Sequence, residues 1–258
     1  MGVRLASLLR KPAGVRGSRQ FQGWFARVAE ELLKRTELVA GGEAHRLLEI
    51  EFYYYGDEHL DPFSHRQPIS QRAGLWYFHR TGNSYRGGSF KGADITFGHR
   101  GAFAGILIRT LQTSSGRVID GPSLCVDHLL KLTGYRSVTD LDGAIGGQKA
   151  WDEDSPLRIR DAVVSHDWHI YSSPRVGLTL NIQRQQNERR DYISRAYRFL
   201  TEPRLIKKGK RQMVLGLHHQ GHSQIEIARL TGCPRIAVER YIREFQTHRR
   251  HGVAHCAE

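Results

Sequence analysis

The chain has few cysteines, no long apolar run and no phosphate-binding loop, and each absence removes a class of protein. Its three cysteines, Cys125, Cys233 and Cys256, are odd in number and far apart, so the sequence supports neither a disulfide framework nor a cysteine-rich zinc site. This usage is typical of a reduced, intracellular protein, in the cytoplasm or nucleoid, or in the nucleus of a eukaryote. No apolar run approaches the ~20 residues that span a bilayer, so we expect no membrane partner.

Acidic residues are also scarce relative to basic ones. Lys and Arg outnumber Asp and Glu by 39 to 26, which gives a formal net charge of +13 and an isoelectric point near 10.0. Such a chain attracts phosphate backbones through counterion release, so nucleic acid is the expected partner. The first nineteen residues contain no acid. We expect residues 1–18 to form a basic, disordered arm attracted to DNA, in preference to a targeting segment.

The charge is concentrated near the end of the chain. Residues 204–251 contain eleven Lys or Arg and three Glu. The entrance to this basic part is the stretch "TEPRLIKKGKRQ", whose composition is typical of a linker. We therefore divide the chain into a body of residues 19–203, a linker of residues 204–210 and a basic domain with its tail at residues 211–258.

The basic domain carries the pattern of a helix-turn-helix in "SQIEIARLTGCPRIAVERYIREF". Ser223 and Glu226 form a capping box that starts one helix, Gly232 ends it, and Pro234 opens the next. The spacing resembles that of resolvase-like helix-turn-helix domains, whose second helix enters the major groove. The alternative is a helical hairpin with a solvated basic face. The DNA-facing side chains that the resemblance implies are Arg235, Glu239, Arg240 and Arg243.

The body reads as an α+β domain. Apolar residues recur at helical spacing in "FQGWFARVAEELLKRT", whereas "HRLLEIEFYYYG" and "GAFAGILIRTL" are typical of strands, and "DGPSLCVDHLLKLTG" starts at Pro122 and ends at Gly134 like a helix. Strict alternation of strand and helix is absent, which argues against a nucleotide-cofactor fold. We expect a mixed, mostly antiparallel, curved sheet with flanking helices. Alternation along the second stretch places Glu49, Glu51 and Tyr53 on one face.

Five short blocks then occur in an order that resembles the alkyladenine (3-methyladenine) DNA glycosylase family. They are "LEIEFYYYG", "DPFSH", "ILIRTL", "DGPSLC" and "SSPRVG", within residues 21–203. The resemblance implies a hydrolase that excises damaged purines from double-stranded DNA in base excision repair, without a metal or an organic cofactor. No lysine stands in the nucleophile's place, so we expect a monofunctional enzyme without lyase activity. We expect it to act as a monomer.

The chemistry of base excision gives each matching residue a role. Cleavage of an N-glycosidic bond passes through an oxocarbenium-like sugar, which a carboxylate can stabilise while it deprotonates water. Glu51 fits this role, and Tyr53 fits stacking on a flipped, cationic base. By resemblance, His65 contacts the base edge, and Arg109 with the backbone of Val176 helps hold the water.

The chain also departs from the family pattern. The family inserts a tyrosine into the gap left by the flipped nucleotide, and here that position falls on glycine within "SYRGGSFKGAD". Tyr85, Arg86 or Phe90 are candidate substitutes, because planar side chains can enter between base steps. Two other hypotheses therefore stay open: a DNA-binding regulator with a degenerate glycosylase domain, and a nucleic-acid-modifying enzyme of different chemistry on a related scaffold.

Overall fold

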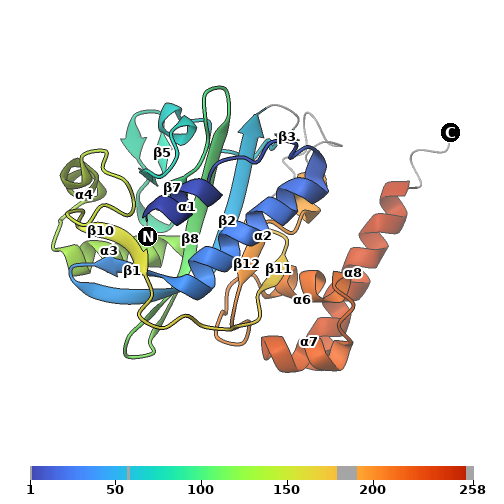
Figure 1. The fold of residues 1–258 in the computed structure, drawn as a ribbon. Coiled ribbons are helices and arrows are strands. Elements are labelled where there is room, and N and C mark those ends of the chain that lie inside the picture. The colour runs from blue at the N-terminus through green and yellow to red at the C-terminus, as the bar shows by residue number, and fades with distance from the viewer. Residues whose placement is uncertain (1, 57–58, 179–190, 254–258) are drawn as a thin grey trace.

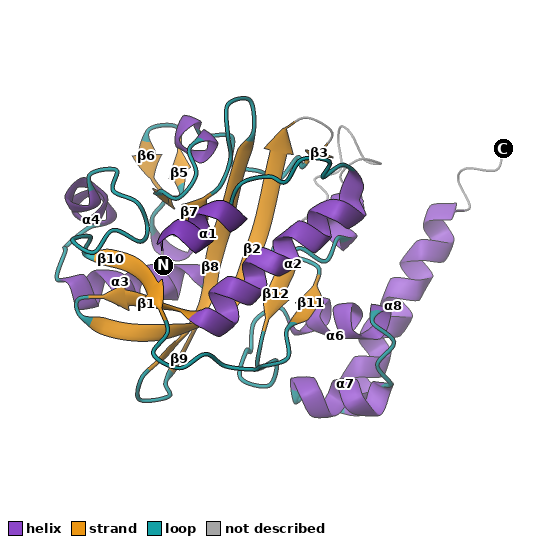
Figure 2. Ribbon diagram, viewed as in Figure 1, coloured by secondary structure: helices purple, strands orange, loops and turns teal. Residues whose placement is uncertain are grey.

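A computed structural model of the chain describes residues 2–56, 59–178 and 191–253. Its centre is an antiparallel sheet in the order β10-β1-β2-β8-β7-β4 (Figures 1 and 2). The bounds are β1 Thr36–Ala40, β2 Glu43–Gly56, β4 Trp76–Phe78, β7 Ala93–Thr96, β8 Phe103–Thr113 and β10 Leu157–Asp161. All pairs between the described strands are antiparallel, so the predicted α+β class is confirmed.

Shorter strands extend this sheet around the long strand β2. β12 (Arg198–Leu200) pairs with β2 and with β11 (Tyr171–Ser173), β3 (His59–Leu60) pairs with the end of β2, and β9 (Val118–Asp120) pairs with β8. β5 (Arg80–Thr81) and β6 (Ser84–Tyr85) form a separate hairpin. The register between β2 and β8 shifts between Leu47 and Glu49 and again between Glu49 and Ile50. Such irregularities bend a strand and re-aim its side chains, here at Glu49 and close to the predicted catalytic residue Glu51.

One face of the sheet packs against helix α2 (Gly17–Arg35), which crosses β2 (Figure 1). Ile50, Phe52 and Tyr54 of β2 are fully buried in the main core, together with aromatic residues of α2. The rings of Phe25 and Phe52 stack with centroids 4.8 Å apart. Because side chains alternate along a strand, Glu49, Glu51 and Tyr53 lie on the opposite face of β2. The face predicted from the sequence is therefore confirmed.

The prediction of a disordered basic arm at residues 1–18 is wrong for most of that segment. Gly2–Leu8 form helix α1, which packs beside α2 (Figure 1). Leu5 and Leu9 have at most 1% of their surface exposed, and the indole N–H of Trp24 donates to the carbonyl of Leu8 over 2.8 Å. The physical reason is the helical spacing of these leucines, which gives the segment a buried side despite its positive charge.

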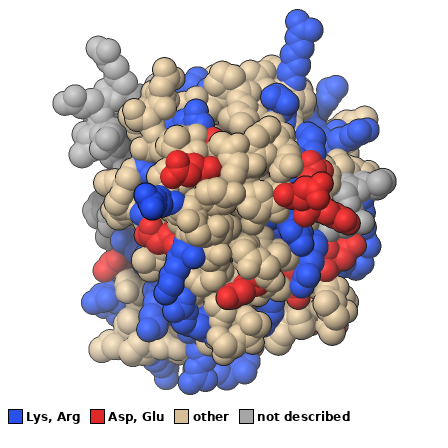
Figure 3. Space-filling model, turned by 90° about the vertical axis from the view of Figure 1, so that its left-hand side faces the viewer, with Lys and Arg blue, Asp and Glu red and all other residues tan. Residues whose placement is uncertain are grey.

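The remaining elements of the body cover its edges. Helices α3 (Pro122–Thr133) and α4 (Val138–Ile145) lie on the side of the molecule opposite the C-terminal helices (Figure 1). Two single-turn 3₁₀ helices, η1 (Pro68–Gln71) and η2 (Gly88–Phe90), lie in the loops around β4 and β7. The α3 and α4 side carries both signs of charge, and Lys and Arg gather along its lower edge (Figure 3). None of the helices within the described ranges is both long and apolar enough to cross a membrane.

The C-terminal unit consists of α6 (Lys210–His219), α7 (Gln224–Thr231) and α8 (Arg235–Val253). The capping box of Ser223 and Glu226 is present, and Gly232 ends α7 at φ +69°. Two apolar side chains of this unit, Ile225 on α7 and Ile236 on α8, are exposed at 67% and 78%. The hydrophobic core of the C-terminal unit is formed by other apolar side chains of the three helices: Met213, Val214, Leu217, Ile227, Val238 and Ile242.

The C-terminal unit packs directly against the body and is not joined to it by a flexible linker. Leu200 of β12 and Ile206 of the predicted linker are fully buried in the same small core as the C-terminal helices. The backbone of α6 lies against β11, since a Cβ added to Gly216 would come within 2.6 Å of the Cβ of Ser173. The segment predicted as linker, residues 204–210, is therefore part of the packed structure.

Candidate functional site

The sequence candidates Glu51, Arg109 and Val176 meet on the face of β2 that α2 does not cover. The backbone N–H of Val176 donates to Oε1 of Glu51 over 2.8 Å, and Nη1 of Arg109 lies 3.3 Å from its Oε2. Glu51 and Arg109 are 5% and 6% exposed. A carboxylate held by a backbone donor and a guanidinium keeps a fixed orientation, which is what a general base requires.

Behind Glu51 lies a second, fully buried carboxylate, which sequence reasoning did not assign to the site. Oε1 of Glu49 accepts from Nε of Arg109 over 2.9 Å and from Nε of Arg198 over 2.5 Å. Oε2 of Glu49 accepts from the hydroxyl of Thr110 over 2.5 Å. Burial opposes ionisation of Glu49, but the two arginines outweigh it and lower its pKa below the ordinary value. Arg109 therefore bridges two carboxylates, and its position depends on both.

Tyr53 and His65 form part of an aromatic cluster next to this network. Their ring centroids are 5.7 Å apart, and His65 also lies 4.3 Å from His79 and 5.9 Å from Tyr77. Burial lowers the pKa of His65 to about 4, so its ring is neutral near pH 7. The predicted pair of Tyr53 and His65 is thus brought together, and two further rings complete a wall that is suited to hold a planar ligand.

Asp94 lies beneath this cluster and is fully buried. Its Oδ2 accepts from the Tyr53 hydroxyl over 2.5 Å, and its Oδ1 lies 2.9 Å from Nε2 of His79. Burial and Asp94 raise the pKa of Tyr53 well above its ordinary value, so the phenol stays protonated and acts as the donor. The carboxylate fixes two of the four rings and places negative charge under the cluster. Asp94 and Tyr53 are 41 residues apart in the sequence, so no local pattern indicates that they are in contact.

Two loops reach the site because a buried ion pair ties them together. Arg175, next to Val176, places Nη1 2.8 Å from Oδ2 of Asp61, at the start of the "DPFSH" loop that carries His65. Nη1 of Arg175 also lies within hydrogen-bond distance, 3.3 Å, of the carbonyl of Phe52 on β2. Both charged groups are at most 5% exposed. The segment that carries His65 is therefore anchored at Asp61, both to the loop of Val176 and to β2.

Tyr85, Arg86 and Phe90 were the candidates to replace the tyrosine that the family inserts into DNA, which we call the wedge. They lie in different environments. The hydroxyl of Tyr85 donates to Asp142 over 2.5 Å, and its ring is covered by the guanidinium of Arg80 at 4.2 Å. Arg86 donates through Nε to Thr81 over 3.2 Å. Phe90, at the end of η2, is 72% exposed. Of the three, only Phe90 combines an apolar ring with a free approach to solvent.

Phe90 is close in sequence to Gly92, a residue that contacts the ring cluster. The backbone of Gly92 lies directly on the His79 ring, since a Cβ added there would come within 2.6 Å of it, and the N–H of His79 donates to the Gly92 carbonyl. Phe90 precedes this contact by two residues. The contact between Gly92 and His79 thus ties the segment that carries Phe90 to the cluster formed by Tyr53, His65, Tyr77 and His79.

The arginines predicted to face DNA lie on α8, the second helix of the helix-turn-helix. Arg235, Arg240 and Arg243 are exposed, as is Glu239. Nη2 of Arg243 lies 2.7 Å from Oε1 of Glu239, one turn earlier, and Nε of Arg240 lies 4.0 Å from Glu244. The exposed Ile236 lies among them and is suited to apolar contact with a thymine methyl group.

We expect Arg240→Ala to weaken binding to duplex DNA. If Arg240 binds a phosphate, the slope of log affinity against log salt concentration falls by about 1 for every DNA sequence. If Arg240 binds a guanine, about 1–3 kcal/mol of binding free energy is lost, and only on specific sites. Fluorescence anisotropy across a salt series separates these results. Arg136→Ala, an exposed arginine beyond α3, is the matched control. Equal affinity of the two variants would contradict a role for Arg240.

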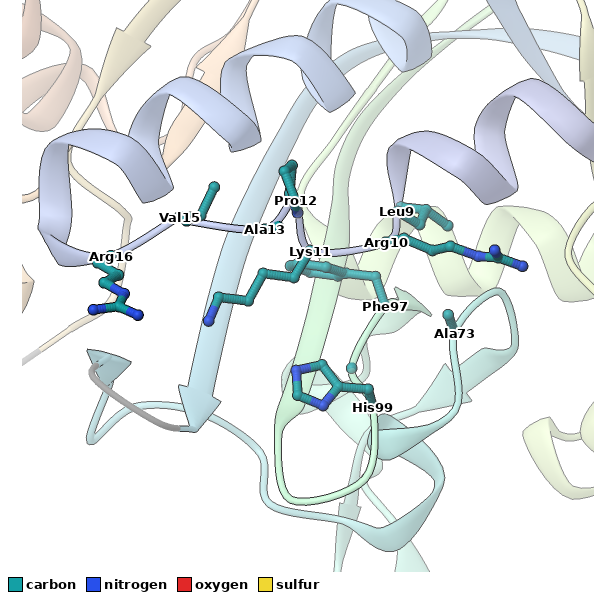
Figure 4. A pocket seen from close by; sticks show the side chains of 12 residues that line it. Leu9, Arg10, Lys11, Pro12, Ala13, Val15, Arg16, Ala73, Phe97 and His99 are labelled. Carbon is teal, nitrogen blue, oxygen red and sulfur yellow. The ribbon is translucent and has the colours of Figure 1, made fainter.

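A cavity of about 510 Å³ lies on the other side of the sheet (Figure 4). The segment between α1 and α2 crosses it, with Lys11 on that segment and Phe97 and His99 opposite. Nε2 of His99 lies 3.0 Å from the hydroxyl of Tyr54, which faces away from Glu51. This cavity is therefore separate from the Glu51 site. Among the described residues, no group of three or more His, Cys, Asp or Glu side chains is placed to hold a metal ion.

Fold and site together define an α+β body with a buried carboxylate centre, joined to a C-terminal helix-turn-helix. Residues 206–254 match the Homeodomain-like domain family, which confirms the predicted helix-turn-helix and assigns it to a class that binds DNA. The chain is also 33% identical, over 175 residues, to an uncharacterized protein of Acanthamoeba polyphaga mimivirus, covering 61% of this chain and 80% of the viral protein. The chain belongs to the family of that viral protein. Since 175 residues exceed the helix-turn-helix, the shared part includes residues of the body.

Proposed function

We propose that this chain is a monofunctional DNA glycosylase that hydrolyses the N-glycosidic bond of alkylated or otherwise damaged purines. The observation that carries the proposal is the geometry of Glu51. Its carboxylate is fixed by the Val176 amide and the Arg109 guanidinium, beside a cluster of four aromatic and imidazole rings. A strand carboxylate that only served solubility would not be buried at 5% exposure with two dedicated partners.

The residues divide the reaction between them. Glu51 takes the proton from a water and stabilises the positive charge that develops on the sugar as the bond to the base breaks. Arg109 and the Val176 amide hold the carboxylate in place. The base leaves with the bonding electron pair, and the water oxygen bonds to the anomeric carbon, which leaves an abasic site. Glu51 acts through ionic contacts and proton transfer, so the proposed step requires no covalent enzyme intermediate.

The ring cluster supplies recognition of the flipped base. Tyr53 offers its face for stacking, and the neutral His65 offers one donor and one acceptor for a base edge. The buried Asp94 adds negative charge beneath the rings, so a cationic, alkylated purine is favoured over a neutral one. This electrostatic preference is the reason to place alkylated purines first among the candidate substrates.

Phe90 is the side chain that we propose to fill the space of the flipped nucleotide, and its removal provides a prediction. Phe90→Ala is expected to lower base release about tenfold from a fully paired duplex, because unstacking costs a few kcal/mol per step, but less from a single strand. Single-turnover rates on both substrates measure the difference. Val163→Ala, which truncates another strongly exposed apolar side chain on a different loop, is the control. An equal loss on both substrates would exclude the wedge role.

The direct test of the proposal uses the purified full chain and a panel of duplexes that each carry one modified purine, together with the matched undamaged duplex. Alkali cleavage reveals abasic sites, and mass spectrometry identifies the free base. We expect release of at least one alkylated purine and none from the undamaged duplex. Strand cleavage before alkali would contradict monofunctional chemistry. Duplex binding without any base release would favour a DNA-binding regulator with a degenerate glycosylase domain.

A further inference from the structure

The three residues that lead into the helix-turn-helix unit, Lys207–Gly209, are fixed to the body at its polar centre. The backbone N–H groups of Lys207 and Lys208 donate to Oδ2 of Asp120, over 2.7 and 2.9 Å. The other oxygen of Asp120, Oδ1, lies 3.2 Å from the hydroxyl oxygen of Thr110. Thr110 in turn donates to Glu49. One carboxylate thus connects the segment to the buried network behind Glu51.

Arg198 makes a second connection. Its Nε donates to Glu49, while Nη1 donates to the carbonyl of Gly209 over 2.9 Å and Nη2 to the carbonyl of Lys208 over 3.1 Å. The guanidinium is fully buried. Because it has a fixed fork of donors, the two carbonyls determine where its Nε points, and therefore where Glu49 holds Arg109.

Gly209 makes a third connection through direct contact. It has φ +69°, and a Cβ added to it would lie 2.3 Å from Cγ2 of Val176 and 2.8 Å from Nη1 of Arg198. Val176 is the residue whose N–H donates to Glu51. Gln220, directly after the end of α6, supports the same region, because its side-chain amide donates to the carbonyl of Ser172 over 2.6 Å, on the strand that leads to Val176.

We propose that Lys207–Gly209 position the Glu51 carboxylate, through Arg198 and Val176, so that the helix-turn-helix unit is a structural part of the site as well as a DNA-binding unit. Arg198 and Gly209 are positioning residues, because they act on Glu51 through Glu49, Arg109 and Val176 and not by direct contact. The expected effect on base release rests on the proposed function. The positioning of Glu51 by residues 207–209 does not depend on that function. A displacement of about 1 Å in such a site costs about 10²-fold in rate.

Gly209→Ala tests the inference in the full chain, with Gly221→Ala as its matched control. Both glycines have a left-handed backbone, φ +69° and +88°, but an added Cβ at Gly221 meets nothing within 4 Å. Backbone strain is therefore similar in the two variants, and only the first pushes on Val176 and Arg198. The readout is hydrogen exchange of the Val176 amide by NMR, with amides of β1 reporting global unfolding.

We expect Gly209→Ala to speed exchange of the Val176 amide about tenfold or more, which corresponds to about 1.4 kcal/mol, while amides of β1 match those of Gly221→Ala. Single-turnover base release should fall in parallel, with duplex affinity unchanged. Equal exchange of the Val176 amide in the two variants overturns the positioning role, whatever the rates. If the Val176 amide exchanges faster in Gly209→Ala but the wild-type protein releases no base, the positioning role stands and the proposed glycosylase activity is refuted.

Discussion

Glu51→Gln is expected to abolish detectable base release, with a loss of about 10²–10⁴-fold, because the amide can neither accept the proton of the attacking water nor balance the charge on the sugar. The substitution preserves the shape of the side chain. Its amide oxygen can still accept from the Val176 N–H, and Arg109 keeps its contact with Glu49 at 2.9 Å. The fold and the duplex affinity should therefore remain.

The measurement is the single-turnover rate of base release beside the dissociation constant for the same duplex. Glu43→Gln is the matched control, since Glu43 is an exposed acid on the same strand and makes the same change of charge. We expect the control to keep the wild-type rate and affinity. A rate in Glu51→Gln equal to that of the control would remove Glu51 from the mechanism.

Local sequence patterns were sufficient for the parts of the fold that local physics determines. Alternation along β2 placed Glu51 and Tyr53 on one face, and the capping box with Gly232 defined α7, because both signals act within a few residues. The family resemblance then implied Arg109 and Val176, from strands and loops far along the chain, and the structure brings both to Glu51. Whether these groups catalyse base excision stays a prediction.

The remaining residues of the site had no local signal. Asp94 under Tyr53, and Arg198 on Glu49, depend on pairings across 41 and 149 residues. The linker of residues 204–210 was misread for a related reason. Its Lys and Gly content is typical of solvated chain, but the backbone amides of Lys207 and Lys208 are held by Asp120 of a distant strand. Composition describes how a segment would behave alone, whereas tertiary contacts decided its conformation.

The largest expected effect on stability belongs to Glu49→Gln. The carboxylate is fully buried and lies within 2.5 Å of Arg198 and 2.9 Å of Arg109, so the amide would leave the fully buried Arg198 without its counter-charge. Breaking one partner of a buried pair costs about 3–5 kcal/mol of unfolding free energy. In a chain of this size that corresponds to about 6–20 °C in melting temperature, at about 2–4 °C per kcal/mol. Glu37→Gln breaks a partly exposed pair with Arg160 and should cost only about 0–1 kcal/mol.

The pH dependence of this effect separates charge pairing from packing. Because the pKa of Glu49 in the folded chain lies below its ordinary value of 4.5, the carboxylate contributes stability that is present above pH 4.5 and is lost as pH falls through the lowered pKa. Urea unfolding of wild type and Glu49→Gln should therefore differ most near pH 7 and converge in acid. A difference that persists unchanged at the lowest pH where the wild type still folds would assign the loss to packing and hydrogen bonding, and not to the buried charge.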